Sequence, residues 1–384
     1  MTHSTPRTHP LREAAHIPRD ALPSTRLIVR HEPLPSVNPG LKKLNDQFKS
    51  IVASSDVRWT VRYRLIERLG AGSQGVVFLG ERLGAHNISL PVALKMFSPE
   101  AHADARAYRR ELERLARVSM RLALIQQDHL LDIHNFVQCR GVGMLVMEWV
   151  DGFDLRHLLQ PATLRVVQSR LSSDRFDYLT DVIITDGPMQ SRLKPGVAIA
   201  VLRECLSALA ALHREGIVHA DIKPPNIMLK RTGNAKLIDF GYAFEIGDKT
   251  APRACTPRYA AVEVLSGDEC SPASDLAGLG YVLVELLSGR TPFAGLQRFG
   301  ELIAAKRQLP DRLPELLPTD IAHDTRLLGV IRGLIAPDPA ERFPSADAAN
   351  LLDDGAANFQ RQLVKGDLSS EYENDIRLWL EQVG

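Results

Sequence analysis

The sequence predicts an α+β fold of two lobes, a small β-rich N-terminal lobe and a larger helical C-terminal lobe. The 384 residues exceed the ~250–300 at which a single hydrophobic core usually stops growing. Residues 59–150 contain short apolar and β-branched runs bounded by Gly, Pro or Asn, which is typical of strands. After residue 151, apolar residues recur at three- and four-residue spacing, which is typical of amphipathic helices.

The chain before the N-terminal lobe divides into two parts. Residues 1–40 are rich in Pro and Arg and poor in apolar side chains, so we expect a disordered tail. Residues 41–58 carry apolar residues at helical spacing between lysines, which predicts an amphipathic helical extension. That helix either docks on the lobe that follows or, together with the tail, binds a partner.

The N-terminal lobe spans residues 59–150 and contains four predicted strands. One helix interrupts them, beginning near Ser98 and carrying Tyr108, Leu112 and Leu115 on one face. The strand sequences are VRYRLIERLG, GVVFLG, LPVALKMF and GVGMLVMEWV.

The C-terminal lobe spans residues 151–350 and is predicted to be mainly helical. Its clearest helix, VAIAVLRECLSALAALHREG, ends at Gly216. Residues 160–195 are polar with mixed charge, and we expect a surface insertion there that is a second candidate for partner docking. Residues 351–384 form a C-terminal helical extension. Further helices are predicted at about 275–288, 298–306, 324–335 and 346–364.

Composition excludes several classes of function. The 47 basic and 46 acidic residues leave a formal net charge of +1, so no global field favours nucleic acid or an anionic membrane. Four cysteines without a CxxC pair predict reduced thiols. The apolar run from Leu276 to Val284 stops well short of the ~20 residues that span a bilayer. We expect a cytoplasmic protein; the alternative is a secreted effector that acts in a host cell.

A glycine-rich stretch, LGAGSQGVVFLG, lies between two predicted strands. Gly70, Gly72 and Gly75 would let backbone N–H groups approach phosphate oxygens, because no Cβ stands in the way. Alone the pattern is weak, since a glycine-rich hairpin is more often only a turn. A dinucleotide-binding fold would need a helix after the last glycine, and here a strand follows.

Lys95 lies in the strand PVALKMF, on the same face as Ala93. A lysine there can meet phosphates as a point charge, although a solvated edge lysine is the commoner case. Glu111 on the following helix could face Lys95 and fix it by an ion pair. Glu113 is the competing candidate.

The segment HADIKPPNIMLK carries Asp221, Lys223 and Asn226, and Asp239 ends the strand in AKLIDFGYAF. Carboxylate and carboxamide oxygens suit Mg²⁺, so Asn226 and Asp239 are candidate metal ligands. Asp221 can accept the proton of an attacking hydroxyl. Lys223 can neutralise the oxygens of a phosphoryl group in transfer.

Taken in this order, the four motifs resemble the eukaryotic-type (Hanks-type) serine/threonine protein kinase family over about residues 60–350. The resemblance implies a bilobal protein-kinase-like fold and ATP-dependent transfer of the γ-phosphoryl group to a protein hydroxyl, with Mg²⁺. It makes Asp221 the catalytic base. Lys95 would hold the nucleotide phosphates and pair with Glu111.

The resemblance also assigns the nucleoside site and two structural contacts. Glu263 would pair with Arg342, and Asp275 would hold the catalytic loop. The residues around adenine and ribose would be Val77, Ala93, Met147, Glu148, Val150, Asp154 and Met228.

Three positions depart from the family pattern. Ala220 replaces an arginine that in many members binds a phosphate on the activation segment, so our hypothesis is that activity does not require that phosphorylation. Lys223 and Thr256, in contrast, match the Ser/Thr branch of the family, so the resemblance implies serine or threonine as the acceptor. Cys255 and Val262 replace a usual glycine and proline, which leaves the substrate preference open.

Two other functions remain. A pseudokinase would bind partners without catalysis, although such proteins usually lose the lysine, the base or the metal aspartate. A small-molecule kinase related to aminoglycoside kinases would phosphorylate an alcohol, although that class generally lacks the full glycine pattern and the TPRYAAVE segment.

Overall fold

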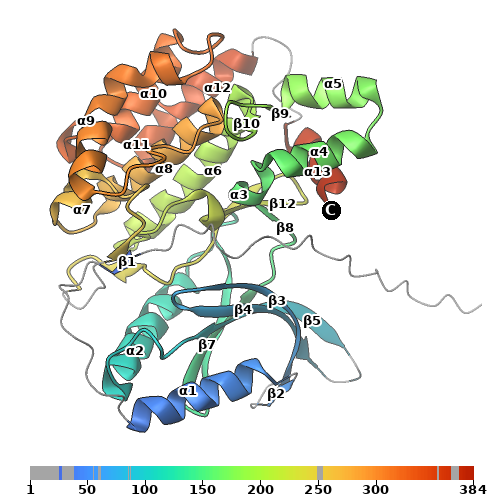
Figure 1. Cartoon of the computed structure of the whole chain (residues 1–384), viewed down its shortest axis with the longest axis vertical. Helices are drawn as coiled ribbons and strands as arrows, with labels where there is room; N and C mark the ends of the chain where they lie inside the picture. Colours follow the sequence, from blue (N-terminus) through green and yellow to red (C-terminus); the bar gives the residue numbers. More distant parts are fainter. Residues whose placement is uncertain are drawn as a thin grey trace, which may run out of the picture.

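The computed structural model has the predicted two lobes, one built on a sheet and one built from helices (Figure 1). It describes residues 26–27, 39–54, 56–58, 62–84, 86, 88–248, 254–352, 354–364 and 372–384.

A six-stranded antiparallel sheet forms the smaller lobe, in the order β2-β3-β4-β5-β7-β6. Helices α1 (Pro39–Val52) and α2 (Ala105–Leu122) lie on this lobe (Figure 1). The strands are β2 (Asp56–Arg58), β3 (Arg62–Gly72), β4 (Gly75–Leu83), β5 (Ser89–Phe97), β6 (Ile133–Cys139) and β7 (Val142–Glu148).

Helix α2 begins later than the sequence predicted. Asp104 is its N-cap, because the Asp104 carboxylate accepts a hydrogen bond from Ala107 N at 2.7 Å. We expected the helix to start at Ser98. The Ser98 backbone N–H instead donates a hydrogen bond to Gln74 O at 2.8 Å. The predicted apolar face is buried, with Tyr108 at 0% exposure.

The larger lobe is organised around two buried helices, α6 (Pro195–Arg214) and α8 (Pro272–Ser288). Among the described residues, α6 alone is long and apolar enough to cross a membrane, but 72% of its apolar window is buried inside the lobe, as in a core helix. The surrounding helices are α3 (Leu155–Leu158), α4 (Pro161–Arg170), α5 (Ser173–Val182), α7 (Val262–Ser266), α9 (Phe299–Leu316), α10 (Thr325–Ile335), α11 (Ala346–Leu351), α12 (Ala356–Val364) and α13 (Tyr372–Val383).

Short strands at the junction of the lobes flank the loops that contain residues 219–226 and 238–243. A three-stranded sheet has the order β13-β12-β8, and β11 pairs with β14. These strands are β8 (Gly152–Asp154), β11 (Ile217–Val218), β12 (Ile227–Lys230), β13 (Ala235–Leu237) and β14 (Phe244–Glu245), with η3 (Pro224–Asn226) before β12 and, farther away, β9 (Ile184–Thr185), β10 (Arg192–Leu193) and η4 (Pro339–Glu341).

Two segment predictions at the N-terminus need correction. The 41–58 extension is not wholly helical, because Asp56–Arg58 form β2 and pair with β3. Within the 1–40 tail, Arg26–Leu27 form β1, whose backbone pairs with β15 (Ala254–Cys255). The rest of that tail up to residue 38 lies outside the described residues.

The 160–195 segment is packed into the helical lobe, so it is not a simple surface insertion. Leu164, Val167, Ile183 and Ile184 are each at most 3% exposed and belong to the main core. Alternating polar residues hid this from the sequence pattern, because each of the two short helices buries only a narrow apolar stripe.

Two predicted helix boundaries also differ. Helix α9 continues past residue 306 through Pro310 and Pro314, because Leu309 and Leu313 are buried against the lobe. The predicted helix 346–364 is two helices separated by a turn, in which Gly355 N donates to Leu352 O at 2.8 Å.

Candidate active site

The glycine-rich stretch forms the hairpin between β3 and β4, with Gly72 paired to Gly75. Gly75 has a φ of +146°, and a Cβ there would lie 1.9 Å from Met96 O, so the position requires glycine. A Cβ on Gly70 or Gly72 would meet no atom within 4 Å. The loop therefore leaves open space above those two glycines, which suits the approach of a phosphate.

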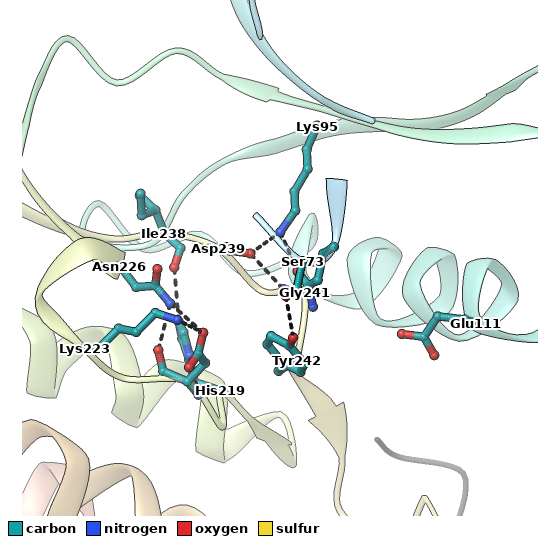
Figure 2. A network of polar contacts seen from close by, with 12 residues as sticks. Ser73, Lys95, Glu111, His219, Lys223, Asn226, Ile238, Asp239, Gly241 and Tyr242 are labelled. Atoms are coloured by element: carbon teal, nitrogen blue, oxygen red, sulfur yellow. Dashed lines mark hydrogen bonds and ion pairs between the residues drawn. The ribbon is translucent and has the colours of Figure 1, made fainter. Parts of the chain in front are cut away.

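The tip of this hairpin reaches the residues after Asp239. Lys95 Nζ donates to Gln74 Oε1 at 2.7 Å, and the Ser73 and Tyr242 hydroxyls lie 3.4 Å apart (Figure 2). A Cβ on Gly241 would lie 1.9 Å from Gln74 Oε1, so a larger residue there would push the Gln74 amide aside. Gln74 and Asp239 occupy two of the three donors of the Lys95 ammonium, so a phosphate could bind the third or replace either partner.

The predicted ion pair between Lys95 and Glu111 is absent, so that prediction is wrong for this arrangement. Lys95 pairs with Asp239. Glu111 pairs instead with Arg114, through Nη2 to Oε1 at 2.7 Å and Nε to Oε2 at 2.9 Å. Figure 2 shows Lys95 directed at Asp239 and the Glu111 carboxylate apart from it on α2. The competing candidate, Glu113, is exposed.

Arg114 is a functional candidate that the sequence interpretation missed. Its side chain is 2% exposed, and besides Glu111 it binds the segment after Asp239, donating to Ala243 O at 2.6 Å and to Gly241 O at 3.0 Å. A signal was present, because an arginine stands beside Leu115 on the apolar face of a helix. A buried guanidinium needs several acceptors, and the tertiary fold supplies them.

Asp221, Lys223 and Asn226 lie together in the loop between β11 and β12. The Asp221 side chain is 2% exposed and lies 2.7 Å from Lys223 Nζ. It accepts hydrogen bonds from Thr256 Oγ1 at 2.7 Å and from Asn226 Nδ2 at 3.1 Å. Lys223 Nζ also donates to Thr256 Oγ1 at 3.3 Å. An aliphatic hydroxyl is therefore held between a carboxylate and an ammonium.

Asp275 on α8 anchors the backbone of this loop. Its carboxylate accepts hydrogen bonds from His219 N and Ala220 N, each at 2.9 Å, and lies 2.9 Å from His213 Nε2. Ala220 has a φ of +63°, a conformation that is unfavourable for a residue with a Cβ and that these bonds hold in place. The expected anchoring role of Asp275 is confirmed.

Asp239 stands at a sharp change of chain direction, with a φ of +64°. Its Oδ1 accepts a hydrogen bond from Gly241 N at 3.1 Å. Burial opposes ionisation of this carboxyl, but the Lys95 and Lys223 ammonium groups outweigh it and lower the Asp239 pKa to about 2. The group is therefore an anion throughout the physiological pH range and can ligate a cation.

Asn226 and Asp239 are the residues that could hold a divalent cation. Ile238 follows β13, and its backbone N–H donates to Asn226 O at 2.9 Å, which keeps the end of β13 beside the loop. Figure 2 shows Ile238 and Asn226 near each other. Asn226 Nδ2 is bonded to Asp221, so Oδ1 is the amide atom that could bind a metal. The described residues contain no group of three or more His, Cys, Asp or Glu suited to a metal. An ion here would complete its shell with phosphate and water oxygens, which is the usual habit of Mg²⁺.

Strand register places the predicted nucleoside residues in two groups, one in each lobe. Val77 pairs with Lys95, and Ala93 pairs with Met147, across adjacent strands. In the other lobe, Met228 pairs with Asp154. All seven predicted residues lie on β4, β5, β7, β8 and β12 or, for Val150, directly after β7.

Two of these residues also have local structural partners. Asp154 is the N-cap of α3 and accepts a hydrogen bond from His157 N at 3.0 Å; its burial raises its pKa. Glu148 N donates to Asp132 O at 2.9 Å, and the Glu148 carboxylate pairs with Lys236. The cap uses Asp154 Oδ1, so Oδ2 is the atom that could bind a ribose hydroxyl.

The chain is similar over most of its length to one known family. Residues 63–352 match the family described as "Protein kinase domain". The chain is 32% identical over 288 residues to the serine/threonine-protein kinase PknD of Mycobacterium tuberculosis, covering 74% of this chain and 38% of that protein. It is 28% identical over 295 residues to the serine/threonine-protein kinase pkn2 of Myxococcus xanthus, covering 74% and 31%. The chain thus spans well under half the length of these relatives.

Proposed function

This chain belongs to the protein kinase family, and we propose that it transfers the γ-phosphoryl group of ATP to a serine or threonine hydroxyl of a protein. The observation that carries the proposal is the Thr256 hydroxyl, which lies 2.7 Å from Asp221 Oδ1 and 3.3 Å from Lys223 Nζ. The site therefore accommodates an aliphatic hydroxyl between a base and a cation. This favours serine or threonine over tyrosine as the acceptor.

Each polar residue then has a distinct role. Asp221 accepts the proton of the attacking hydroxyl. At the same time the hydroxyl oxygen bonds to the γ-phosphorus, and the bond between that phosphorus and the leaving ADP oxygen breaks. Lys223 neutralises charge on the phosphoryl oxygens. Lys95 exchanges Asp239 for the nucleotide phosphates. Bound ATP·Mg²⁺ supplies the phosphoryl group and a cation, which Asn226 and Asp239 would hold.

Incubation with labelled ATP and Mg²⁺ tests this proposal. The acceptors are a mixture of dephosphorylated proteins and, in parallel, an aminoglycoside alcohol. We expect label on protein as phosphoserine or phosphothreonine. Label on the alcohol alone would identify a small-molecule kinase. Tight ATP binding without any transfer would identify a pseudokinase.

The Arg114–Glu111 pair is expected to restrain activity. Arg114→Met should raise the transfer rate at subsaturating ATP about five- to tenfold. The substitution removes a free-energy preference of roughly 1 kcal/mol for the Glu111–Arg114 pair, so Glu111 becomes free to bind Lys95. Initial rates at several ATP concentrations measure the effect. Arg117→Met, an exposed arginine on the same helix, is the matched control. An Arg114→Met enzyme that is stable but no faster than the parent would show that the pair does not restrain the enzyme.

We further propose that activity does not depend on a phosphate on the activation segment. Alanine at position 220 offers no guanidinium to such a phosphate, and the Ala220 N–H is bonded to Asp275. Thr250→Ala is expected to keep the parent rate within about twofold, because Ala220 offers no charged partner to a phosphate at that position. Thr250 itself lies outside the described residues.

The test compares rates and mass spectra of the parent and Thr250→Ala enzymes. Thr256→Ala cannot serve for this purpose, because the Thr256 hydroxyl contacts Asp221 directly and its loss should reduce the rate for that reason. A phosphorylated Thr250 whose alanine variant is folded but inactive would overturn the proposal.

A further inference from the structure

Lys306 is a fully enclosed cation in the larger lobe. It lies on α9, its exposure is 0%, and its Nζ donates to Arg258 O at 2.8 Å. The ammonium also faces two aromatic rings, 3.8 Å from the Tyr281 centroid and 4.2 Å from the Phe293 centroid. The rings meet edge to face, with centroids 5.5 Å apart. The two rings form an aromatic cage around the ammonium.

Within the described ranges, no carboxylate forms an ion pair with the Lys306 ammonium. Glu263 is the near acid, and both of its oxygens are bonded to Arg342 at 2.8 and 2.7 Å. Burial therefore lowers the Lys306 pKa well below its usual value. A buried cation held by rings and one carbonyl is less stable than an apolar side chain of the same size would be.

The Phe293 backbone is strained where it completes the cage. Its φ is +56°, which a residue with a large side chain rarely adopts. Strain and a buried cation therefore occur at one place, and neither improves stability. Such features tend to persist where a particular geometry is needed for function.

The cage holds the chain segment that follows Thr256. This segment is fixed at three points: the Thr256 hydroxyl at Asp221, the Arg258 carbonyl at Lys306, and the Tyr259 hydroxyl, which donates to Glu285 at 2.7 Å. Because Thr256 contacts the proposed base, the residues after it line the place where the neighbours of an acceptor hydroxyl would lie. A shift of the Arg258 carbonyl would change the shape of that surface.

We propose that Lys306 is a positioning residue that sets which side chains next to the acceptor hydroxyl are accepted in the protein substrate. The inference rests on the proposed kinase activity and assigns one determinant of its specificity. The ammonium fixes the register of α9 against residues 256–259, because any other register would leave a buried cation without its acceptor. Lys306 takes no part in nucleotide binding.

The test is Lys306→Met, which keeps an unbranched side chain one atom shorter and removes the amino group. Each enzyme is given a positional library of serine- and threonine-containing peptides, and KM is then measured for ATP and for the best peptide. Arg307→Met is the matched control, an exposed cation on the same helix. Thermal unfolding is recorded for all three proteins.

For Lys306→Met we expect a flatter residue preference beside the acceptor and a peptide KM raised about fivefold or more, since one positioning hydrogen bond is lost. The KM for ATP should stay within about twofold, and the melting temperature should be unchanged or higher. An unchanged residue preference in Lys306→Met would contradict the inference. A lower melting temperature together with equal increases in KM for ATP and for the peptide would also contradict it, because a residue with a merely structural role would give that result. If the parent enzyme labels no peptide or protein, the proposed function itself fails.

Discussion

Asp221→Asn is expected to reduce phosphoryl transfer by about 10³-fold, within the range that a general base contributes. Asparagine fills the same volume and can still accept the hydrogen bond from Thr256 Oγ1, but it cannot take up the proton of an attacking hydroxyl. It also lacks the charge that pairs with Lys223 at 2.7 Å. We also expect a lower melting temperature, because the Lys223 ammonium loses its buried carboxylate partner. Steady-state rates at saturating ATP, with a melting curve beside them, measure both quantities.

Asp177→Asn provides the control for this change. Asp177 is an exposed carboxylate on α5, far from the loop in sequence, and its loss should leave the rate unchanged. Lys95→Ala should likewise abolish transfer, because it removes the cation that would meet the nucleotide phosphates. Retained turnover in Asp221→Asn or in Lys95→Ala would contradict the roles assigned to these residues.

Arg342→Met is expected to lower the free energy of unfolding by about 3–5 kcal/mol, the usual cost of breaking a buried ion pair from one side. The Arg342 side chain is 0% exposed and forms the bidentate pair with Glu263 that the family resemblance implied. It also donates to Ala273 O and Ala336 O, each at 2.8 Å. The variant leaves a buried carboxylate and two carbonyls without this donor.

The loss of unfolding free energy in Arg342→Met should be smaller at acidic pH. Burial raises the Glu263 pKa, but the Arg342 guanidinium outweighs that effect and holds it below the ordinary 4.5. This contribution to stability is therefore present above the unfolded-state pKa and is lost as the pH falls through the lower folded-state value. In Arg342→Met, protonation of Glu263 relieves the buried charge.

Denaturant unfolding at pH 7 and at about pH 4 tests both parts of this prediction. Arg326→Met, an exposed arginine on α10, should stay within ±0.5 kcal/mol of the parent. A deficit for Arg342→Met no larger than that of the control, or one that does not depend on pH, would mean that the ion pair adds no net stability.

Local chemistry in the sequence was a reliable guide wherever neighbours along the chain define the site. Asp221, Lys223 and Asn226 lie within one short loop, so their meeting depends on little beyond that loop. The glycine hairpin is equally local, and Gly75 occupies a position where a Cβ would clash. The division into two lobes follows from the change of apolar periodicity near residue 151, which the fold confirms.

Segments with weak periodicity were predicted less well. The 160–195 segment looked like an insertion because its polar residues outnumber the few apolar ones that reach the core. Asp56–Arg58 were assigned to a helical extension because the pairing that makes them a strand is with β3, and hydrogen bonding between strands leaves no mark on a three-residue sequence.

The sequence by itself determined the family, the two-lobed architecture and the order of the reactive groups, because motif spacing and periodicity are local properties. Only the tertiary structure decided how charged groups are paired. Arg114 takes Glu111, Lys95 takes Asp239, and Lys306 meets the Arg258 carbonyl. Several candidate partners exist for each ion, and the choice among them depends on distance and burial, which arise when separate helices and loops pack together.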